Sequence, residues 1–199
     1  MAKKKRNGLI VYWSKTGNTE KVAKAIKEGL EEAGLIINVK KPEEAQNTDF
    51  FNYDLICIGT PSYSWHLPEP MAKFLKEKFA FYRKQGKIKP SAPKVPGKNA
   101  LIFVTYSGPH TGINEAIPVG KDVRQFFEHI GFTVIDEWYI LSEFHGSLEY
   151  NTKGKMGDIR GKPTKEDLEI ITENAKLILN VLSKLQKKFQ FKNEISVKV

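Results

Sequence analysis

Short apolar runs alternate along the chain with longer segments whose apolar residues recur every three or four positions. The short runs have the length and composition of buried strands, and the longer segments have the periodicity of amphipathic helices. The pattern predicts strands at about 8–13, 35–39, 54–59, 99–105 and 132–140, and helices at about 19–33, 69–79, 118–130 and 164–188. Strands that alternate with helices predict a parallel sheet joined by right-handed crossovers.

Length and composition indicate one domain. A chain of 199 residues with 40% hydrophobic content can bury a full core. We place this domain at residues 7–188, between a basic tail at 1–6 and a carboxyl-terminal extension at 189–199. The extension alternates weakly between apolar and polar residues, as an added edge strand or a dimer contact would, so a homo-oligomer is left open. No apolar run approaches the ~20 residues that span a bilayer.

Two stretches are longer than a minimal fold of this kind needs. Residues 80–98 are rich in lysine and contain several prolines, which predicts an exposed loop. Residues 141–163 form a second long connection, and connections of that length are usually functional or mobile. The second stretch either lies over a ligand or is a surface excursion away from it.

The net charge of +9 is concentrated at the two ends of the chain. Residues 3–6 contribute +4 and residues 184–199 another net +4, which leaves only +1 on residues 7–183. Basic chains often bind nucleic acid, but no recognised nucleic-acid motif accompanies these charges, and we expect no such partner. Solvated termini are the simplest explanation, and attraction of an acidic partner or an anionic substrate is the alternative.

Cysteine and histidine usage excludes some chemistry. Cys57, the only cysteine, lies in the middle of a predicted strand, so an internal disulfide is excluded and a reducing, cytoplasmic setting is expected. The four histidines are dispersed and show none of the spacings typical of metal ligands, so we predict no metal site.

The first predicted strand runs directly into a hydroxyl-rich turn that opens a helix. This turn, residues 14–19, contains Ser14, Thr16, Asn18 and Thr19 around Gly17. A helix N-terminus presents unpaired backbone N–H groups and the positive end of a dipole, which together hold an anion such as a phosphate. The turn matches neither the nucleoside-triphosphate P-loop nor the dinucleotide fingerprint. It therefore predicts a phosphate site of a different kind.

Two later strands end in aromatic and hydroxyl residues, at 60–66 and at 105–112. In an open α/β sheet, ligands bind outside the carboxyl ends of the strands, at the topological switch point. The first strand end is suited to a phosphate, and the other two are rich in aromatic residues that could contact a planar ring. Together they predict a site for a phosphorylated planar ligand.

These three segments, in this order, resemble the flavodoxin superfamily over roughly residues 8–183. The resemblance implies a three-layer α/β sandwich, with a five-stranded parallel sheet of order 2-1-3-4-5 and helices on both faces. It also implies non-covalently bound FMN, with Tyr63 or Trp65 stacked on the flavin ring and Tyr106 near the ring edge. The cofactor-binding residues that it implies are Ser14, Thr16, Gly17, Asn18, Thr19, Thr60, Pro61, Ser62, Tyr63, Ser64, Trp65, Thr105, Tyr106, Ser107, Gly108 and His110.

The resemblance leaves the function class open. The main expectation is an electron-transfer protein that uses FMN to pass electrons to or from a partner protein or a small-molecule acceptor. The alternative is an NAD(P)H-dependent reductase of quinones or similar acceptors, and a flavin-free binding module on the same fold is a third class. No catalytic residue is assigned. His110 is the candidate, because it could donate a hydrogen bond or positive charge near the flavin.

Overall fold

The computed structural model describes residues 5–196, with side chains as far as residue 189. Two short 3-10 helices, Phe50–Asn52 and Gly112–Glu115, accompany the main elements. The main elements are β1 (Asn7–Tyr12), α1 (Asn18–Glu32), β2 (Ile36–Lys40), β3 (Leu55–Pro61), α2 (Glu69–Lys84), β4 (Asn99–Tyr106), α3 (Ile117–His129), β5 (Thr133–Leu141), α4 (Leu148–Thr152) and α5 (Lys165–Ser196).

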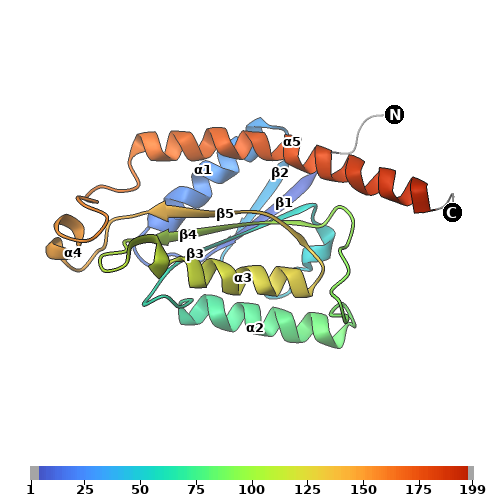
Figure 1. The fold of residues 1–199 in the computed structure, drawn as a ribbon, viewed down its shortest axis with the longest axis horizontal. Coiled ribbons are helices and arrows are strands. Elements are labelled where there is room, and N and C mark those ends of the chain that lie inside the picture. The colour runs from blue at the N-terminus through green and yellow to red at the C-terminus, as the bar shows by residue number, and fades with distance from the viewer. Residues whose placement is uncertain (1–4, 197–199) are drawn as a thin grey trace.

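The five strands form one parallel sheet in the order β2-β1-β3-β4-β5. Helices α1 and α5 cover one face of this sheet, and α2 and α3 cover the other (Figure 1). The three-layer sandwich and the strand order expected from the sequence are therefore confirmed. The order reverses direction between β1 and β3, which makes the carboxyl ends of these strands the switch point where ligands bind in such sheets.

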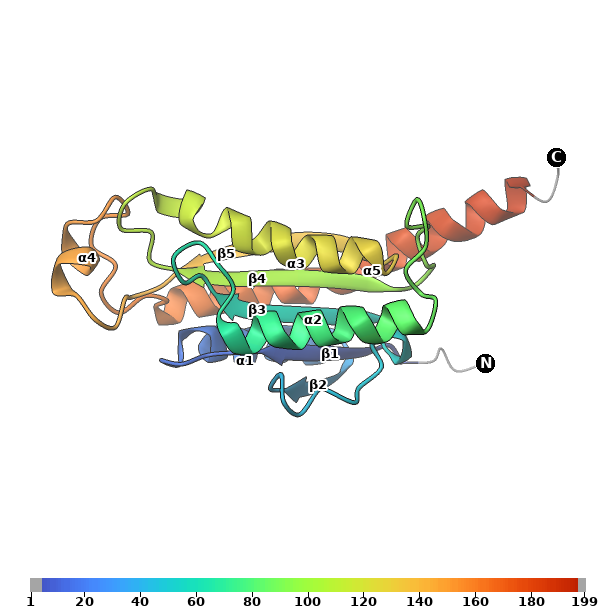
Figure 2. The same ribbon diagram turned by 90° about the horizontal axis from the view of Figure 1, so that it is seen from below.

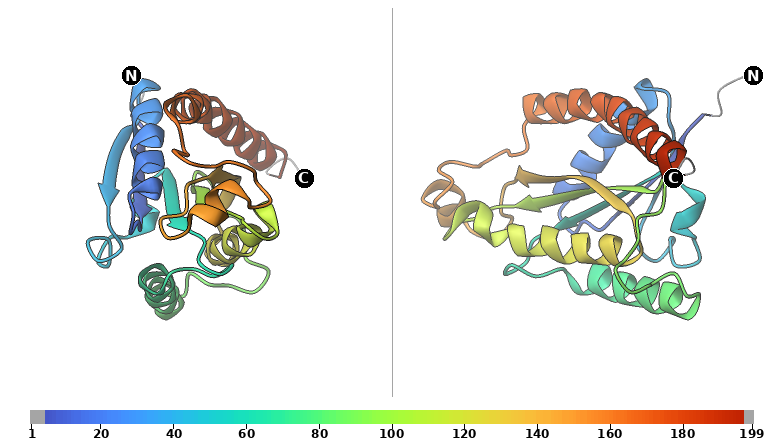
Figure 3. Two further views of the ribbon diagram at one scale, coloured as in Figure 1. Left: turned by 90° about the vertical axis from the view of Figure 1, so that its left-hand side faces the viewer. Right: turned by 45° about the vertical axis from the view of Figure 1, so that its right-hand side comes forward.

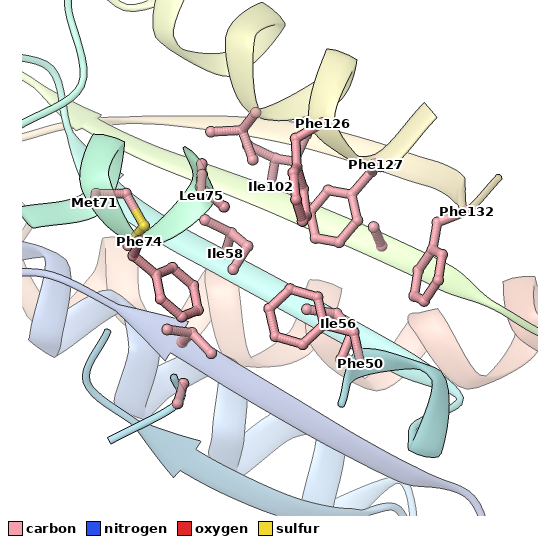
Figure 4. Close-up of a cluster of buried hydrophobic side chains, with 14 of the residues drawn as sticks. Phe50, Ile56, Ile58, Met71, Phe74, Leu75, Ile102, Phe126, Phe127 and Phe132 are labelled. Carbon is pink, nitrogen blue, oxygen red and sulfur yellow. The ribbon is translucent and has the colours of Figure 1, made fainter. Parts of the chain in front are cut away.

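Each face of the sheet packs its own hydrophobic core. On the α2 and α3 side, Phe50, Phe74, Phe126 and Phe127 gather against the strands (Figure 4). On the other side, α1 and α5 pack on alternate residues of the same strands, among them Cys57, which is fully buried. Burial raises the pKa of the Cys57 thiol, so this cysteine is a packed core residue.

The predicted helices and strands are confirmed, but three segments differ from the expectation. Helix α2 continues to Lys84, so the exposed loop predicted at 80–98 begins only after it. Helix α5 continues to Ser196, so an edge strand over 189–196 was wrong; residues 197–199 lie outside the described residues. The short helix α4 was not predicted. It lies within the 141–163 segment, which turns that stretch into an ordered excursion.

Local capping explains where α5 begins. The Thr164 hydroxyl accepts a hydrogen bond from the Asp167 backbone N–H at 3.3 Å, and the Asp167 carboxylate accepts one from the Thr164 N–H at 2.7 Å. This reciprocal arrangement is a capping box, here with aspartate in place of the usual glutamate. Thr164 is therefore the N-cap of α5.

A buried lysine holds the long β2–β3 connection against α2. The side chain of Lys78 is almost fully buried, and its ammonium donates hydrogen bonds to the carbonyls of Gln46 at 2.7 Å and Thr48 at 2.6 Å. Nearby, the Tyr82 hydroxyl accepts a hydrogen bond from the Phe50 N–H at 2.7 Å. Burial lowers the pKa of Lys78 to about 8.

Candidate cofactor site

Loops from β1, β3 and β4 meet at the carboxyl ends of these strands, at the end of the molecule where α4 lies (Figures 1 and 2). They are the three segments that the sequence had singled out, at 14–19, 60–66 and 105–112. The strands that carry them are neighbours in the sheet, which brings the three loops together.

The first loop forms a tight turn into α1. Gly17 takes a left-handed conformation with φ of 94°, which a residue with a Cβ rarely adopts. The Ser14 hydroxyl accepts a hydrogen bond from the Gly17 N–H at 3.1 Å, which fixes the shape of the turn. The side chains of Lys15 and Thr16 are exposed. The first N–H groups of a helix have no partner within it, so this turn offers backbone donors and exposed hydroxyls to an anion.

Asn18 and Thr19 instead connect the first loop to its neighbours. Both side chains are buried. The Asn18 amide donates to the carbonyl of Glu143 at 3.0 Å, and the Thr19 hydroxyl pairs with the Thr105 hydroxyl at 2.8 Å. The structure therefore gives these polar side chains protein partners, and they tie the phosphate-type turn to the 141–163 segment and to the end of β4.

The second loop is a tight hairpin turn that presents two aromatic side chains. Tyr63 and His66 exchange backbone hydrogen bonds of 3.0 and 2.9 Å, and Ser64 and Trp65 between them have φ of 47° and 56°. Two successive positive φ angles are characteristic of a type I′ turn. Tyr63 is 41% exposed and Trp65 is 56% exposed. The Tyr63 ring also packs edge-on against Trp13, with centroids 5.7 Å apart.

Thr60 and Ser62 anchor the base of this hairpin. Thr60 is fully buried, and its hydroxyl donates to the carbonyl of Pro61 at 3.1 Å. The Ser62 N–H donates to the Thr105 carbonyl at 2.9 Å, and its hydroxyl donates to the carbonyl of Glu115. These residues hold the second and third loops side by side.

The third loop is shaped by Glu115. Its carboxylate accepts hydrogen bonds from the backbone N–H groups of His110 at 2.8 Å and Thr111 at 2.6 Å. Gly108 has φ of 57°, and a Cβ there would lie 2.6 Å from the Gly112 carbonyl oxygen. Ser107 is half-buried, and the His110 side chain is exposed.

Tyr106, at the end of β4, does not present an open ring face. It is only 7% exposed, and burial raises the pKa of its hydroxyl. Of the three predicted ring contacts, Tyr63 and Trp65 are thus accessible in this structure, whereas Tyr106 offers at most its edge.

The 141–163 segment packs against the third loop. The Lys155 N–H donates to the Pro109 carbonyl at 2.8 Å, and the Tyr150 ring lies edge-on to His110 at 5.2 Å. The buried Asn151 fixes the start of the segment, because its amide both accepts from the Phe144 N–H and donates to the Phe144 carbonyl. The segment therefore lies at the site end of the molecule (Figure 1). Phe144 and Tyr150 are both about two-fifths exposed there, at 39% and 37%.

Sequence reasoning missed several residues that shape this site. In the sequence, Trp13 ends a predicted strand, Glu115 lies in the connection between the 105–112 segment and the predicted helix at 118–130, and Asn151 lies in the long 141–163 connection. Only Trp13 carried a usable signal, since it lies next to the phosphate-type turn. The roles of Glu115 and Asn151 depend on tertiary contacts with backbone groups.

Two hollows lie away from this edge. One, of about 670 Å³, is at the opposite end, where Arg6, Pro96 and Phe189 are among its lining residues. The other, of about 270 Å³, lies between α2 and α3 beside Phe79 and Phe126. The smaller hollow reaches Leu67, just after the second loop, but the other residues that line the two hollows lie outside the three loops. Within residues 5–196, no helix is long and apolar enough to cross a bilayer.

Comparison with known proteins agrees with this geometry. A family model described as flavodoxin matches residues 10–173. A quinone-type NAD(P)H dehydrogenase of Paraburkholderia phymatum is 24% identical, and the match covers 89% of this chain and 97% of that protein. A flavodoxin of Clostridium beijerinckii is 30% identical over 97 residues, which cover 49% of this chain and 62% of that protein. The solved structure of an archaeal flavodoxin shares the fold, with a TM-score of 0.62, 20% identity and coverage of 89% and 99%.

The chain therefore belongs to the flavodoxin family. It is a flavodoxin-like redox protein, and this membership implies FMN as its cofactor. The residues at the three loops are of the kinds that bind FMN. A left-handed glycine turn with exposed donors suits the phosphate, and the exposed rings of Tyr63 and Trp65 suit a planar heterocycle.

Proposed function

We propose that this protein binds FMN at the rim formed by the three loops and passes electrons through it to or from a redox partner. When bound, FMN supplies the capacity to accept and donate one or two electrons. The observation that carries the proposal is the pairing of a phosphate-type turn at Gly17 with two large exposed aromatic side chains, Tyr63 and Trp65, on the neighbouring loop. Exposed apolar side chains that gather in one place, as these two rings do on one loop, are typical of a ligand-binding surface.

The residues divide into two groups in this proposal. Those that face the ligand bind the phosphate, as Ser14, Thr16 and the Gly17 turn do, or cover the ring. The others, which are buried or half-buried, hold the loops in register, so the site is preorganised before the ligand arrives. Facing residues are Ser14, Thr16, Gly17, Tyr63, Ser64, Trp65, Ser107 and His110, and supporting residues are Asn18, Thr19, Thr60, Pro61, Ser62, Thr105, Tyr106 and Gly108.

The electron donor and acceptor belong to the proposal as well. A partner protein or a small-molecule acceptor, in a cytoplasmic setting, is the main reading. A second candidate function is an NAD(P)H-dependent reductase of quinones. The cluster of His110, Phe144 and Tyr150 favours it, because this cluster adds a partly exposed aromatic wall beside the rim. The full-length similarity to a quinone-type NAD(P)H dehydrogenase supports it too.

Anaerobic titration of the FMN-loaded protein with NADH and NADPH, followed by visible absorbance, tests the proposal. Bleaching followed by turnover with a water-soluble benzoquinone would establish the reductase. Stable FMN binding without reduction by either nucleotide would establish a carrier that needs a partner protein. The Tyr150→Ala variant is the matched probe, since it should slow quinone turnover and leave FMN binding unchanged. Failure of the wild-type protein to hold FMN at micromolar concentration would contradict the proposal.

A further inference from the structure

Helix α5 carries an exposed apolar stripe on the side that faces away from α1. Ile170 is 60% exposed, Leu177 is 58% exposed and Val181 is 41% exposed. At 3.6 residues per turn, positions seven and eleven residues after Ile170 return to nearly the same direction. Contacts with α1 come from the other flank, where the Thr172 hydroxyl donates to the Ala25 carbonyl at 3.2 Å and Lys176 pairs with Glu32 at 2.6 Å.

The residues of this stripe are not the ones that hold α5 on the rest of the domain. The helix is anchored by a separate row of buried residues, Ile171, Ala175, Ile178 and Leu182, which pack on the sheet and α1. Three exposed apolar side chains in a row between residues 170 and 181 are therefore not explained by the fold of one chain. Helix α5 itself runs beside α1 on the same face of the sheet (Figure 3), and β5 is an edge strand of that sheet.

Charge along α5 changes sign from one end to the other. Near its start, the acids Glu166, Asp167, Glu169 and Glu173 outnumber Lys165 and Lys176, and near its end are Lys184, Lys187 and Lys188. The Glu173 side chain is 70% exposed although it pairs with Lys176, and Lys184 is exposed as well. Glu166, Glu173, Lys184 and Lys188 fall in nearly the same direction as the apolar stripe. The stripe is therefore acidic at its start, apolar in the middle and basic at its end.

We propose that this stripe is the contact surface of a homodimer in which two α5 helices pack antiparallel about a two-fold axis. An axis midway between Leu177 and Val181 places Leu177 of one chain against Val181 of the second copy. The same pairing brings Glu173 near Lys184 of the second copy and sets Ile170 against the aliphatic stem of its Lys188. A parallel pairing would oppose like charges, whereas the antiparallel one matches acid to base twice, as an isologous interface requires.

The geometry also sets the strength of the association. Residues 166–188 span about 33 Å of helix. A contact of this length with three apolar side chains from each chain buries much less surface than the ~1,600 Å² of a standard interface. We therefore infer a reversible dimer whose population depends on protein concentration and falls at high salt, because exposed charges are screened. The proposal does not depend on the cofactor or on the proposed function.

Sedimentation velocity of the full chain across a concentration series tests the dimer. Leu177→Asp should shift the protein to monomer, while Leu148→Asp, which places the same charge on a 68% exposed leucine of α4, should leave the dimer intact. Circular dichroism of both variants checks that they fold. Both should fold, because each substituted leucine is exposed.

A charge swap tests the antiparallel register. Glu173→Lys and Lys184→Glu should each weaken dimerisation by about tenfold, and the double variant should restore most of the loss. Wild-type protein that stays monomeric up to about 100 µM would overturn the proposal. So would a dimer that Leu177→Asp leaves unchanged, or single charge reversals that the double variant fails to rescue.

Discussion

The hydrogen bond from Asn18 to the Glu143 carbonyl joins the phosphate-type turn to the 141–163 segment, and its removal has a calculable effect. In Asn18→Ala the 3.0 Å bond is lost, and a half-buried carbonyl loses its partner. A typical hydrogen bond contributes about 1 kcal/mol net, and an unpaired buried acceptor costs about 1–3 kcal/mol. Alanine is a better helix former than asparagine by about 0.6 kcal/mol, which offsets part of the loss.

The exposed Asn180 of α5 supplies the control, because Asn180→Ala measures the propensity gain in a helix interior, which is the upper limit of the gain at Asn18, the first residue of α1. Relative to that control, Asn18→Ala should be destabilised by about 1.5 kcal/mol. For a domain of this size, this free energy corresponds to a Tm about 3–6 °C lower.

Differential scanning calorimetry of the two variants measures the difference in Tm, and hydrogen exchange locates it. Amides of residues 142–162 should exchange faster in Asn18→Ala than in the control, because the segment loses its tie to α1. Equal Tm values for the two variants, or unchanged protection of 142–162, would show that Asn18 does not couple the two loops.

Three further predictions concern ligand binding and the core. Thr16→Ala should weaken FMN by about tenfold or more and leave riboflavin unaffected, as measured by quenching of flavin fluorescence, since an exposed hydroxyl that binds phosphate contributes only to the phosphorylated ligand. Trp65→Ala should weaken FMN and riboflavin to the same degree, by about five- to tenfold, because it removes a ring and no phosphate donor. Lys78→Met should lower the free energy of unfolding at pH 7 by about 2 kcal/mol or more, because the carbonyls of Gln46 and Thr48 lose their donor. The pKa of Lys78 is about 8 in the folded protein and near 10.5 in the unfolded chain. Between these pH values the unfolded wild-type chain holds a proton on Lys78 that the folded protein has lost, so the free energy of unfolding of the wild type should rise with pH. Urea titrations at several pH values should show this rise in the wild type relative to Lys78→Met.

The sheet could be predicted from the sequence because its signals are local. Apolar runs such as 54–59 and 99–105 lie in central strands, where both faces are buried, and a continuous apolar run is the expected pattern there. The phosphate-type turn was also local, since Gly17 and its hydroxyl neighbours lie within six residues. For the same reason the start of the last helix at about 164 could be predicted, since its capping residues Thr164 and Asp167 are three positions apart.

Other features could not be predicted, because they depend on contacts between distant residues. The pairing of Thr19 with Thr105 joins residues 86 positions apart, and the bond from Asn18 to Glu143 joins residues 125 apart. A sequence pattern marks such residues as polar but does not show whether they face a ligand or each other. The extension of α5 to Ser196 was missed because weak alternation near the end of the chain resembled a strand, although the helical periodicity of the preceding residues continues.

The central claim is that the 14–19 turn holds the phosphate of a bound flavin. Equilibrium titration of the cofactor-free wild-type protein with FMN and with riboflavin, followed by flavin fluorescence at equal salt, tests it most directly. FMN should bind with micromolar or tighter affinity and riboflavin at least about tenfold more weakly, because each charge-assisted hydrogen bond to phosphate is worth more than about 1 kcal/mol. Equal affinity for the two flavins, or no binding of either, would contradict it.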